Sequence, residues 1–305
     1  MKTATTLPQQ NVLLLQGGGA LGAYQAGVFE ALERSGLELD WVVGTSIGAI
    51  NAAIIAGNPP HRRLEHLFEF WARMGQNGSA SSAQSDCDDD PCAGLATRWN
   101  ALVTMLFGLP GFFRPRWTSP FRLGLAAPAA QAGLYDTSEL QANLLELVDF
   151  DYLAASPVRL TVGAVDVESC EIRYFDSRDM AIRVEHVLAS GALPPAFAPV
   201  EIDGRRYWDG GLHSNSPIER VLRDNPRRHS LCFLATLWPT DGKTPDTLAD
   251  VLLRAKEIQY ASRVDTLVGL EQELHRLRHF LLLLGQRLPE AERSRAEVSG
   301  LLGFG

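Results

Sequence analysis

The stretch VLLLQGGGALG (residues 12–22) contains the clearest structural signal in the sequence. An apolar run followed directly by three glycines is typical of a buried strand of a parallel sheet that ends in a tight loop. A helical pattern follows and ends at Gly36, a common C-terminal stop. A second apolar run, residues 41–43, leads to Gly44 and to a helix of small residues. Strand, helix, strand and helix in this order predict an α/β fold.

The remaining patterns extend this class along most of the chain. From Thr247 to Leu284 an apolar stripe at helical spacing predicts a long helical tail. The sequence leaves open whether this stripe packs on the core or on a second chain. Apolar runs bounded by turn residues predict strands over residues 158–165, 172–175, 207–208 and 231–237, and a helix over residues 182–190.

These patterns predict one α/β domain over residues 10–240 and a helical extension over residues 245–305. Residues 75–130 form a loop-like or lid-like insertion in the first domain. Within it, Cys87 and Cys92 bracket an acidic run that could hold a metal ion. The surrounding small polar residues favour a flexible linker instead, so no metal site is expected.

The composition excludes several classes of protein. The chain has 305 residues, 46% of them hydrophobic and 21% charged, as in ordinary globular proteins. A net charge of −8 lacks the basic footprint of nucleic-acid binding, so no nucleic-acid partner is expected. The first ten residues do not resemble a secretory signal, and no apolar run reaches the ~20 residues that span a bilayer. We therefore expect a cytoplasmic protein.

The glycine-rich loop, Gly17 to Gly22, is the first of three chemical motifs. Its backbone N–H groups can approach an anion, either a phosphate or an oxyanion that develops during a reaction. The loop also matches the dinucleotide pattern G-x-G-x-x-G, which needs an acidic residue at the carboxyl end of the next strand. Asp40 has the right sequence distance but precedes that strand, which disfavours a dinucleotide site.

The other two motifs follow later strands. G-T-S-I-G at residues 44–48 matches the G-x-S-x-G nucleophile elbow, a tight turn that exposes the serine hydroxyl, here of Ser46. D-G-G begins at Asp209 and can bring a carboxylate next to a serine on a neighbouring strand. Each motif alone also fits an ordinary turn. Together, and in this order, they are far more specific.

The three motifs resemble those of the patatin-like phospholipase family. ASGALPPAFAPV, residues 189–200, is similar to the family's segment ahead of its aspartate. The resemblance covers roughly residues 10–240, and the tail resembles the helical extension of a bacterial subgroup. It implies a three-layer patatin-like α/β fold with a mainly parallel central sheet flanked by helices, plus a C-terminal helical extension.

The resemblance also implies a serine lipid acyl hydrolase of the phospholipase, lysophospholipase or carboxylesterase type, acting on a lipid or acyl ester without a cofactor. Ser46 would be the nucleophile and Asp209 the general base of a Ser-Asp dyad that forms an acyl-enzyme intermediate. The oxyanion hole would lie at Gly17, Gly18 and Gly19, with the amides of Gly18 and Gly19 as donors. The other motif glycines are Gly22, Gly44, Gly48, Gly210 and Gly211.

Two alternatives remain open at this point. One is a Ser-His-Asp esterase in which His213 or His229 is the base, because both follow later strands. The other is a non-catalytic nucleotide-binding or interaction protein that uses the glycine-rich loop. Leu21 departs from the family pattern, since many members carry Lys or Arg there.

An aromatic and arginine-rich segment lies between Trp99 and Phe121. One interpretation is a lid or a docking surface that contacts a membrane through Trp99, Phe112, Phe113 and Trp117, which would make the protein peripheral at the inner membrane face. The other is a satellite core packed on the sheet.

Overall fold

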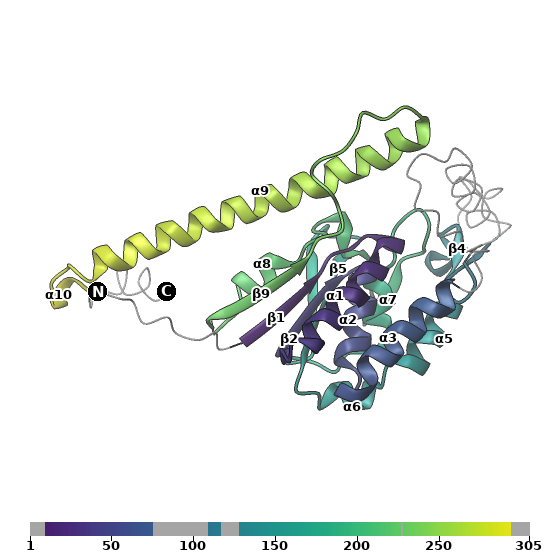
Figure 1. Cartoon of the computed structure of the whole chain (residues 1–305), viewed down its shortest axis with the longest axis horizontal. Coiled ribbons are helices and arrows are strands. Elements are labelled where there is room, and N and C mark those ends of the chain that lie inside the picture. Colours follow the sequence, from purple (N-terminus) through teal and green to yellow (C-terminus); the bar gives the residue numbers. More distant parts are fainter. Residues whose placement is uncertain (1–9, 76–108, 117–127, 227, 294–305) are drawn as a thin grey trace. The chain divides into compact units, whose positions relative to one another are not determined.

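The computed structural model describes residues 10–75, 109–116, 128–226 and 228–293 (Figure 1). The chain divides into two compact units. The first comprises residues 1–217 and 228–237 and contains the sheet. The second comprises residues 218–227 and 238–305 and contains the long helix α9 (Leu248–Gly285).

Within the described residues, seven strands form one sheet in the order β7-β8-β5-β2-β1-β9, and β6 also pairs with β5. Four strands run parallel: β1 (Gln10–Leu15), β2 (Trp41–Thr45), β5 (Arg159–Asp166) and β9 (Ser230–Ala235). Three are antiparallel to their neighbours: β6 (Ile172–Asp176), β7 (Val200–Ile202) and β8 (Arg205–Asp209).

Helix α2 (Ile47–Ala56) is central to the first unit, and every one of its residues is buried. It contacts β1, β2 and β5 on one side and the helices α1, α3, α5 and α7 around it (Figure 1). Its alanines allow this close packing because a small side chain lets two backbones approach. These four helices are α1 (Ala23–Arg34), α3 (Pro60–Gly75), α5 (Ser138–Leu147) and α7 (Val184–Ser190), and the short helix α6 (Phe150–Ala154) follows α5 in the chain.

Several short strands and helices lie outside the main sheet and its covering helices. A two-stranded sheet pairs β3 (Arg114–Pro115) with β4 (Tyr135–Asp136). The described residues include the short 3-10 helices η1 (Gly19–Gly22), η3 (Ala129–Gln131) and η4 (Gly210–Leu212). The second unit also contains α8 (Ile218–Leu222) and α10 (Glu290–Arg293).

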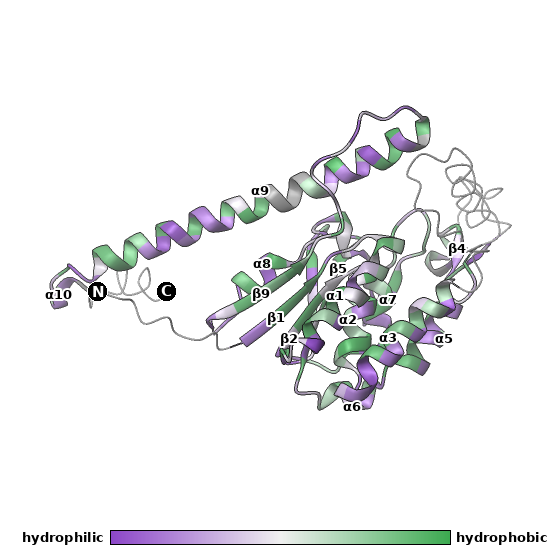
Figure 2. Ribbon diagram, in the orientation of Figure 1, coloured by the Kyte–Doolittle hydropathy of each residue, from purple (hydrophilic) through white to green (hydrophobic). Residues whose placement is uncertain are grey.

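The expected class, α/β with a mainly parallel central sheet flanked by helices and a C-terminal helix, is confirmed. The prediction of a buried strand over residues 231–237 was wrong in part. Strand β9 ends at Ala235, and its Leu231 is 41% exposed. Apolar content alone suggested burial, but β9 is the last strand of the sheet and has only β1 beside it. Figure 2 shows apolar residues along the predicted tail helix as well.

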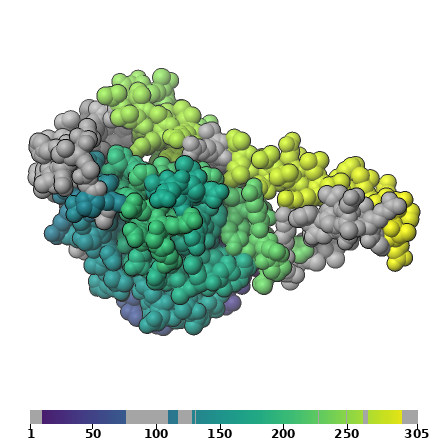
Figure 3. Space-filling view, turned by 180° about the vertical axis from the view of Figure 1, so that it is seen from behind, coloured from purple at the N-terminus to yellow at the C-terminus, as the bar shows by residue number. Residues whose placement is uncertain are grey.

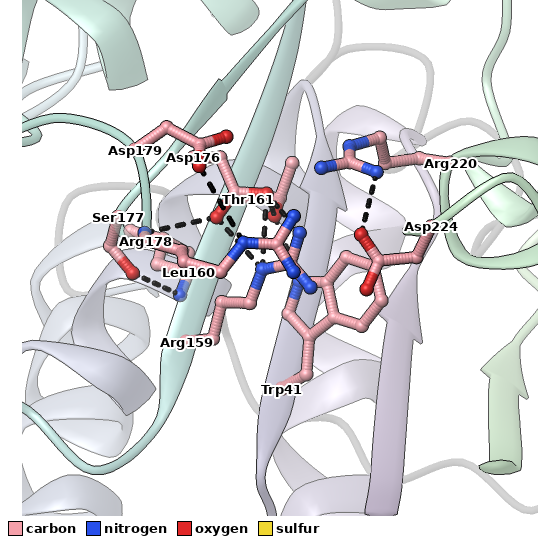
Figure 4. A network of polar contacts seen from close by, with 10 residues as sticks. All are labelled: Trp41, Arg159, Leu160, Thr161, Asp176, Ser177, Arg178, Asp179, Arg220 and Asp224. Carbon is pink, nitrogen blue, oxygen red and sulfur yellow. Dashed lines mark hydrogen bonds and ion pairs between the residues drawn. The ribbon is translucent and has the colours of Figure 1, made fainter. Parts of the chain in front are cut away.

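A buried polar network joins β2, β5 and β6 at the amino ends of the parallel strands (Figure 4). The Arg159 guanidinium donates to both carboxylate oxygens of Asp176, at 2.8 and 3.0 Å from Nε, and lies 3.6 Å over the Trp41 ring. The indole N–H of Trp41 donates to Thr161, whose hydroxyl donates to Asp176. Burial opposes the ionisation of Asp176, but these bonds hold its pKa below the usual range.

We expect Asp176→Asn to lower the free energy of unfolding by about 3–5 kcal/mol, because it leaves the guanidinium of Arg159 buried without its counter-charge. Denaturant titration measures the change. Asp203→Asn is the control, since Asp203 pairs with Arg183 at 3.2 Å but both side chains are more than half exposed. The control should cost less than about 1 kcal/mol. Equal losses in the two variants would contradict a special role for the network.

Candidate active site

Ser46 occupies the turn between β2 and α2, with φ 57° and ψ −127°. Non-glycine residues rarely adopt a positive φ, so the surrounding structure must hold this one in place. Gly48 allows the turn: a Cβ at this position would lie 2.1 Å from the backbone carbonyl oxygen of Leu15 in β1. A Cβ on Gly44 would in turn meet the carbonyl oxygen of Gly48. The G-x-S-x-G motif therefore forms the strand-turn-helix elbow that the sequence predicted.

Asp209 lies at the end of β8, opposite Ala164 of β5, and is 1% exposed. One carboxylate oxygen, Oδ2, accepts a hydrogen bond of 2.7 Å from the Ser46 hydroxyl. The other, Oδ1, accepts a 2.7 Å bond from the Gly211 amide. The fold thus brings together a serine and an aspartate that are 163 positions apart in the sequence.

The carboxylate of Asp209 has an unusual pKa. Burial raises it to about 7, although the hydrogen bonds from Ser46 and Gly211 favour the charged form. Both of these partners are neutral, so neither supplies a full positive charge. A carboxylate with a pKa near neutrality can accept a proton at physiological pH and also return it.

The glycine-rich loop lies beside this pair. The Gly17 amide donates to the Asn215 carbonyl oxygen at 3.2 Å, and the Asn215 side chain donates to the Gly17 carbonyl at 2.7 Å. The expectation that Gly17 takes part in an oxyanion hole therefore needs correction, because its N–H is already used. Gly18 is half-buried and Gly19 is exposed with a φ of 58°, which leaves their amides as the candidate donors.

Buried amide side chains of α1 and α2 hold the two ends of the glycine-rich loop. Gln25 of α1 donates to the Gln16 carbonyl at 2.7 Å, and Asn51 of α2 donates to the carbonyl of Gly22 and to Gln25. The Trp71 indole completes the chain by donating to Asn51. Sequence reasoning did not single out these residues. The sequence signal for Asn51 was a single polar residue in the otherwise apolar stretch IGAINAAIIA, residues 47–56, whereas Gln25 lies in a helix of mixed composition that gave no such signal.

Ser190, the last residue of α7, contacts the elbow from a third direction. Its hydroxyl donates to the Gly163 carbonyl at 2.7 Å and accepts a 3.1 Å bond from the Ser46 amide. It therefore ties the strained turn to β5. The sequence marked residues 189–200 as a segment, but not this hydroxyl as a contact of Ser46.

The structure does not bring either candidate histidine into the pair. His229 immediately precedes β9, which runs parallel to β2. It therefore lies at the amino ends of the parallel strands, whereas Ser46 lies at their carboxyl ends. His213 is exposed, and the Ser46 hydroxyl donates to Asp209 instead. Asp40 also lies at the amino ends of these strands, where its carboxylate accepts a hydrogen bond from the backbone N–H of Asn11. That position is unsuited to a ribose contact beside the glycine-rich loop.

Residues 109–116 of the aromatic and arginine-rich segment lie within the described part of the chain. Phe112 and Phe113 are half-buried and form a cluster with Phe197, and Phe113 also packs on Tyr135 with ring centroids 4.7 Å apart. This packing favours the satellite-core interpretation for these two residues. The other members of the predicted docking surface, Trp99 and Trp117, lie outside the described residues, as do Cys87 and Cys92.

Two further findings concern the described part of the chain. It contains no group of three or more His, Cys, Asp or Glu side chains placed to hold a metal ion. It also contains no helix with the length and apolar character needed to cross a membrane.

Comparison with known families gives a direct result. The family model described as patatin-like phospholipase matches residues 13–222, and a model described as patatin phospholipase matches residues 258–305. The chain belongs to the patatin-like phospholipase family. Membership accounts for the order of the three motifs, and the second match covers most of the helical tail.

Individual relatives of this patatin-like chain are more distant. A patatin-like phospholipase domain-containing protein of Caenorhabditis elegans, ZK370.4, is 24% identical over 75% of this chain and 14% of its own length. The lysophospholipase nte1 of Aspergillus terreus is 54% identical over 21% of this chain and 4% of its own length. This chain therefore spans a small part of these relatives. Among solved structures, VipD from Legionella pneumophila matches at 20% identity and a TM-score of 0.42, over 86% of this chain and 56% of VipD.

The close approach of α2 to β1 at Gly48 should affect the stability of this member of the patatin-like family. We expect Gly48→Ala to lower the free energy of unfolding by about 1–3 kcal/mol, because a backbone atom of β1 occupies the space of the added methyl group. Gly27→Ala in α1 is the matched control, since nothing lies within 4 Å of its Cβ position. Alanine there should leave stability unchanged or raise it by up to about 1 kcal/mol. Similar unfolding curves for both variants would argue against the steric constraint.

Proposed function

We propose that this chain is a serine lipid acyl hydrolase in which Ser46 is the nucleophile and Asp209 the general base. The observation that supports this proposal most directly is the 2.7 Å hydrogen bond from the Ser46 hydroxyl to the buried Asp209 carboxylate. Serine is a weak nucleophile until a base takes its proton, and this is the contact that such a transfer requires. Family membership supports a lipid ester as the substrate.

In the proposed reaction, Ser46 Oγ attacks the ester carbonyl carbon while its proton moves to Asp209. The carbonyl oxygen becomes an oxyanion that accepts hydrogen bonds from the amides of Gly18 and Gly19. One such donor contributes about 2.7–4 kcal/mol to barrier lowering in comparable sites. Collapse of the intermediate breaks the ester C–O bond, and Asp209 returns the proton to the departing alcohol. Water then releases the acyl group from Ser46 by the same steps, with Asp209 accepting the proton of the water.

Ser190 and Asn215 hold this site in shape in the proposed mechanism. Ser190 accepts from the Ser46 amide, which keeps the hydroxyl of the strained residue directed at Asp209. The Asn215 carbonyl accepts from the Gly17 N–H, and the Asn215 side chain donates to the Gly17 carbonyl. These two bonds orient the amides of Gly18 and Gly19 that follow. These preformed contacts matter because misplacement of a catalytic group by about 1 Å is costly to the rate.

We expect Ser46→Ala and Asp209→Asn each to abolish hydrolysis of a short-chain p-nitrophenyl ester, because each removes one end of the proton transfer. Ser46→Ala should also abolish covalent labelling by a fluorophosphonate. His213→Asn and His229→Asn serve as controls and should retain the wild-type rate. Turnover at the wild-type rate in either dyad variant, or its loss in a histidine variant that is still folded, would refute the proposed dyad.

The pKa of Asp209 predicts the pH dependence of the reaction. Below about pH 7 the carboxyl is protonated and cannot accept the Ser46 proton, so kcat/KM should fall about tenfold per pH unit on the acid side. Above that value the rate should reach a plateau. The rate of fluorophosphonate labelling should follow the same curve. A rate that stays constant between about pH 5 and pH 8 would exclude Asp209 as the base.

The raised pKa of Asp209 also makes the free energy of unfolding depend on pH, in the direction opposite to the rate: stability falls as the pH rises. A carboxyl whose pKa is raised on folding favours the folded state at pH values below its unfolded pKa, and this contribution is lost as the pH rises to about 7. Asp209→Asn should therefore raise the free energy of unfolding relative to wild type more at pH 8 than at pH 4. Parallel denaturant titrations at the two pH values measure this difference.

A further inference from the structure

The segments that surround Ser46 and Asp209 carry almost no charge. Four segments supply this pair, its hydrogen-bond partners and the glycine-rich loop, namely residues 12–29, 41–60, 187–200 and 207–217. Figure 3 shows the part of the chain that contains the last two, in teal and green, gathered on one face of the first unit. The four segments contain no Lys, Arg or Glu, and Asp209 is their only aspartate. Because 21% of the whole chain is charged, this absence of charge is local to the site.

Leucine side chains lie beside the groups that would act on an ester. The Leu21 amide donates to the Gly18 carbonyl at 3.3 Å, and the Leu21 Cβ lies 3.5 Å from the position that a Cβ on Gly18 would take. Leu237, which is buried, approaches the same position to 2.6 Å. Leu212 ends η4, the turn that begins directly after Asp209. Leu21 and Leu212 are 45% and 41% exposed, so they present apolar surface to a molecule that enters the site.

Three arginines of neighbouring elements already have partners within the protein. Arg116 and Arg205 each lie 3.0 Å from an aspartate carboxylate. Arg173 of β6 donates to a tyrosine hydroxyl, also at 3.0 Å. A substrate anion would therefore compete with existing contacts for these guanidinium groups.

Asp209 itself reports how this environment treats a negative charge. Burial raises its pKa to about 7, although two hydrogen bonds favour the charged form. An anionic group bound close by would meet the same loss of hydration. It would also be repelled by the carboxylate of Asp209 whenever that carboxylate is ionised.

We propose that the site selects acyl esters of uncharged alcohols, such as acylglycerols, over acyl esters that carry a phosphate head group, with Leu21 as the specificity-determining residue. In a glycerol ester, a terminal phosphate lies about 6 Å from the ester oxygen, by ordinary bond lengths. With the ester carbonyl at the Gly18 amide, this distance is enough to reach the Leu21 side chain. The inference rests on the proposed function for the position of the ester, and it names the substrate class of the same site.

The first test measures binding without turnover. The ligands are decylglycerol and decylglycerol phosphate, two ethers that cannot be hydrolysed and that differ only in the phosphate. Titration calorimetry at pH 8, below the micellar concentration, should give wild type at least tenfold weaker affinity for the phosphate. Leu21→Arg should shift the ratio of the two affinities at least tenfold towards the phosphate, because it places a cation beside Gly18, and high salt should reduce this shift.

Leu145→Arg is the matched control, because it adds the same charge far from Ser46. Leu145 is 56% exposed near the end of α5, where the Leu147 carbonyl accepts a hydrogen bond from Asn58, just beyond the end of α2 opposite Ser46. This variant should keep the wild-type preference. Circular dichroism checks that each variant is folded.

The second test measures hydrolysis of the corresponding esters, decanoylglycerol and decanoylglycerol phosphate. Wild type should prefer the uncharged ester at least tenfold in kcat/KM. Leu21→Arg should lower this ratio at least tenfold, mainly through a lower KM for the phosphate ester, since the added cation contacts a part of the substrate that does not react. A merely structural role of Leu21 would change both esters alike.

Three results would overturn the proposal. One is wild type that binds both ethers equally or binds neither. Another is an equal shift of preference in Leu21→Arg and Leu145→Arg. The third is a loss of the preference in His213→Asn, because His213 supplies the only imidazole of the four segments. Failure of the proposed chemistry is distinguishable: selective binding of the uncharged ether without hydrolysis of either ester would refute the hydrolase and leave the selectivity standing.

Discussion

The start of α2 approaches the end of β1 so closely that no side chain fits between them at Gly48. This contact determines the sharp turn that places Ser46 at φ 57°. A strained turn of this kind persists only where its surroundings hold it, and the Ser190 hydroxyl does so from α7. The same approach allows α2 to lie on three strands while its Asn51 supports the glycine-rich loop. The proposed nucleophile and oxyanion donors thus depend on one backbone contact.

Two buried aspartates of the same sheet show how partners decide the behaviour of a carboxylate. Asp176, at the amino edge, is bonded by the Arg159 guanidinium, and its pKa is lowered despite burial. Asp209 lies at the carboxyl ends of the parallel strands, where its partners among the described residues are a hydroxyl and a backbone amide, and burial raises its pKa. The first carboxylate is suited to holding strands together. The second is suited to exchanging a proton near neutral pH, which is the property that the proposed chemistry needs.

The second unit illustrates a limit of apolar patterns. Its stripe at helical spacing correctly predicted a helix, and α9 begins and ends within one residue of the expected range. The same stripe suggested burial against the core or a second chain. Several of its members are more than half exposed, including Leu252, Leu270 and Leu277, and both partners remain open. Periodicity identifies the face that avoids water, but it contains no information on the partner that covers it.

The sequence by itself determined the fold class, the family and the three motifs, because strands, helices and tight glycine turns depend on local patterns of a few residues. It also indicated correctly that Asp40 lies at the wrong end of its strand for a dinucleotide site. It could not exclude His213 or His229, recognise Ser190 and Asn215 as supports, or show that the Gly17 amide is already bonded. Those results required the tertiary structure. Each depends either on a hydrogen bond between residues far apart in the chain or on the direction in which a distant strand runs in the sheet.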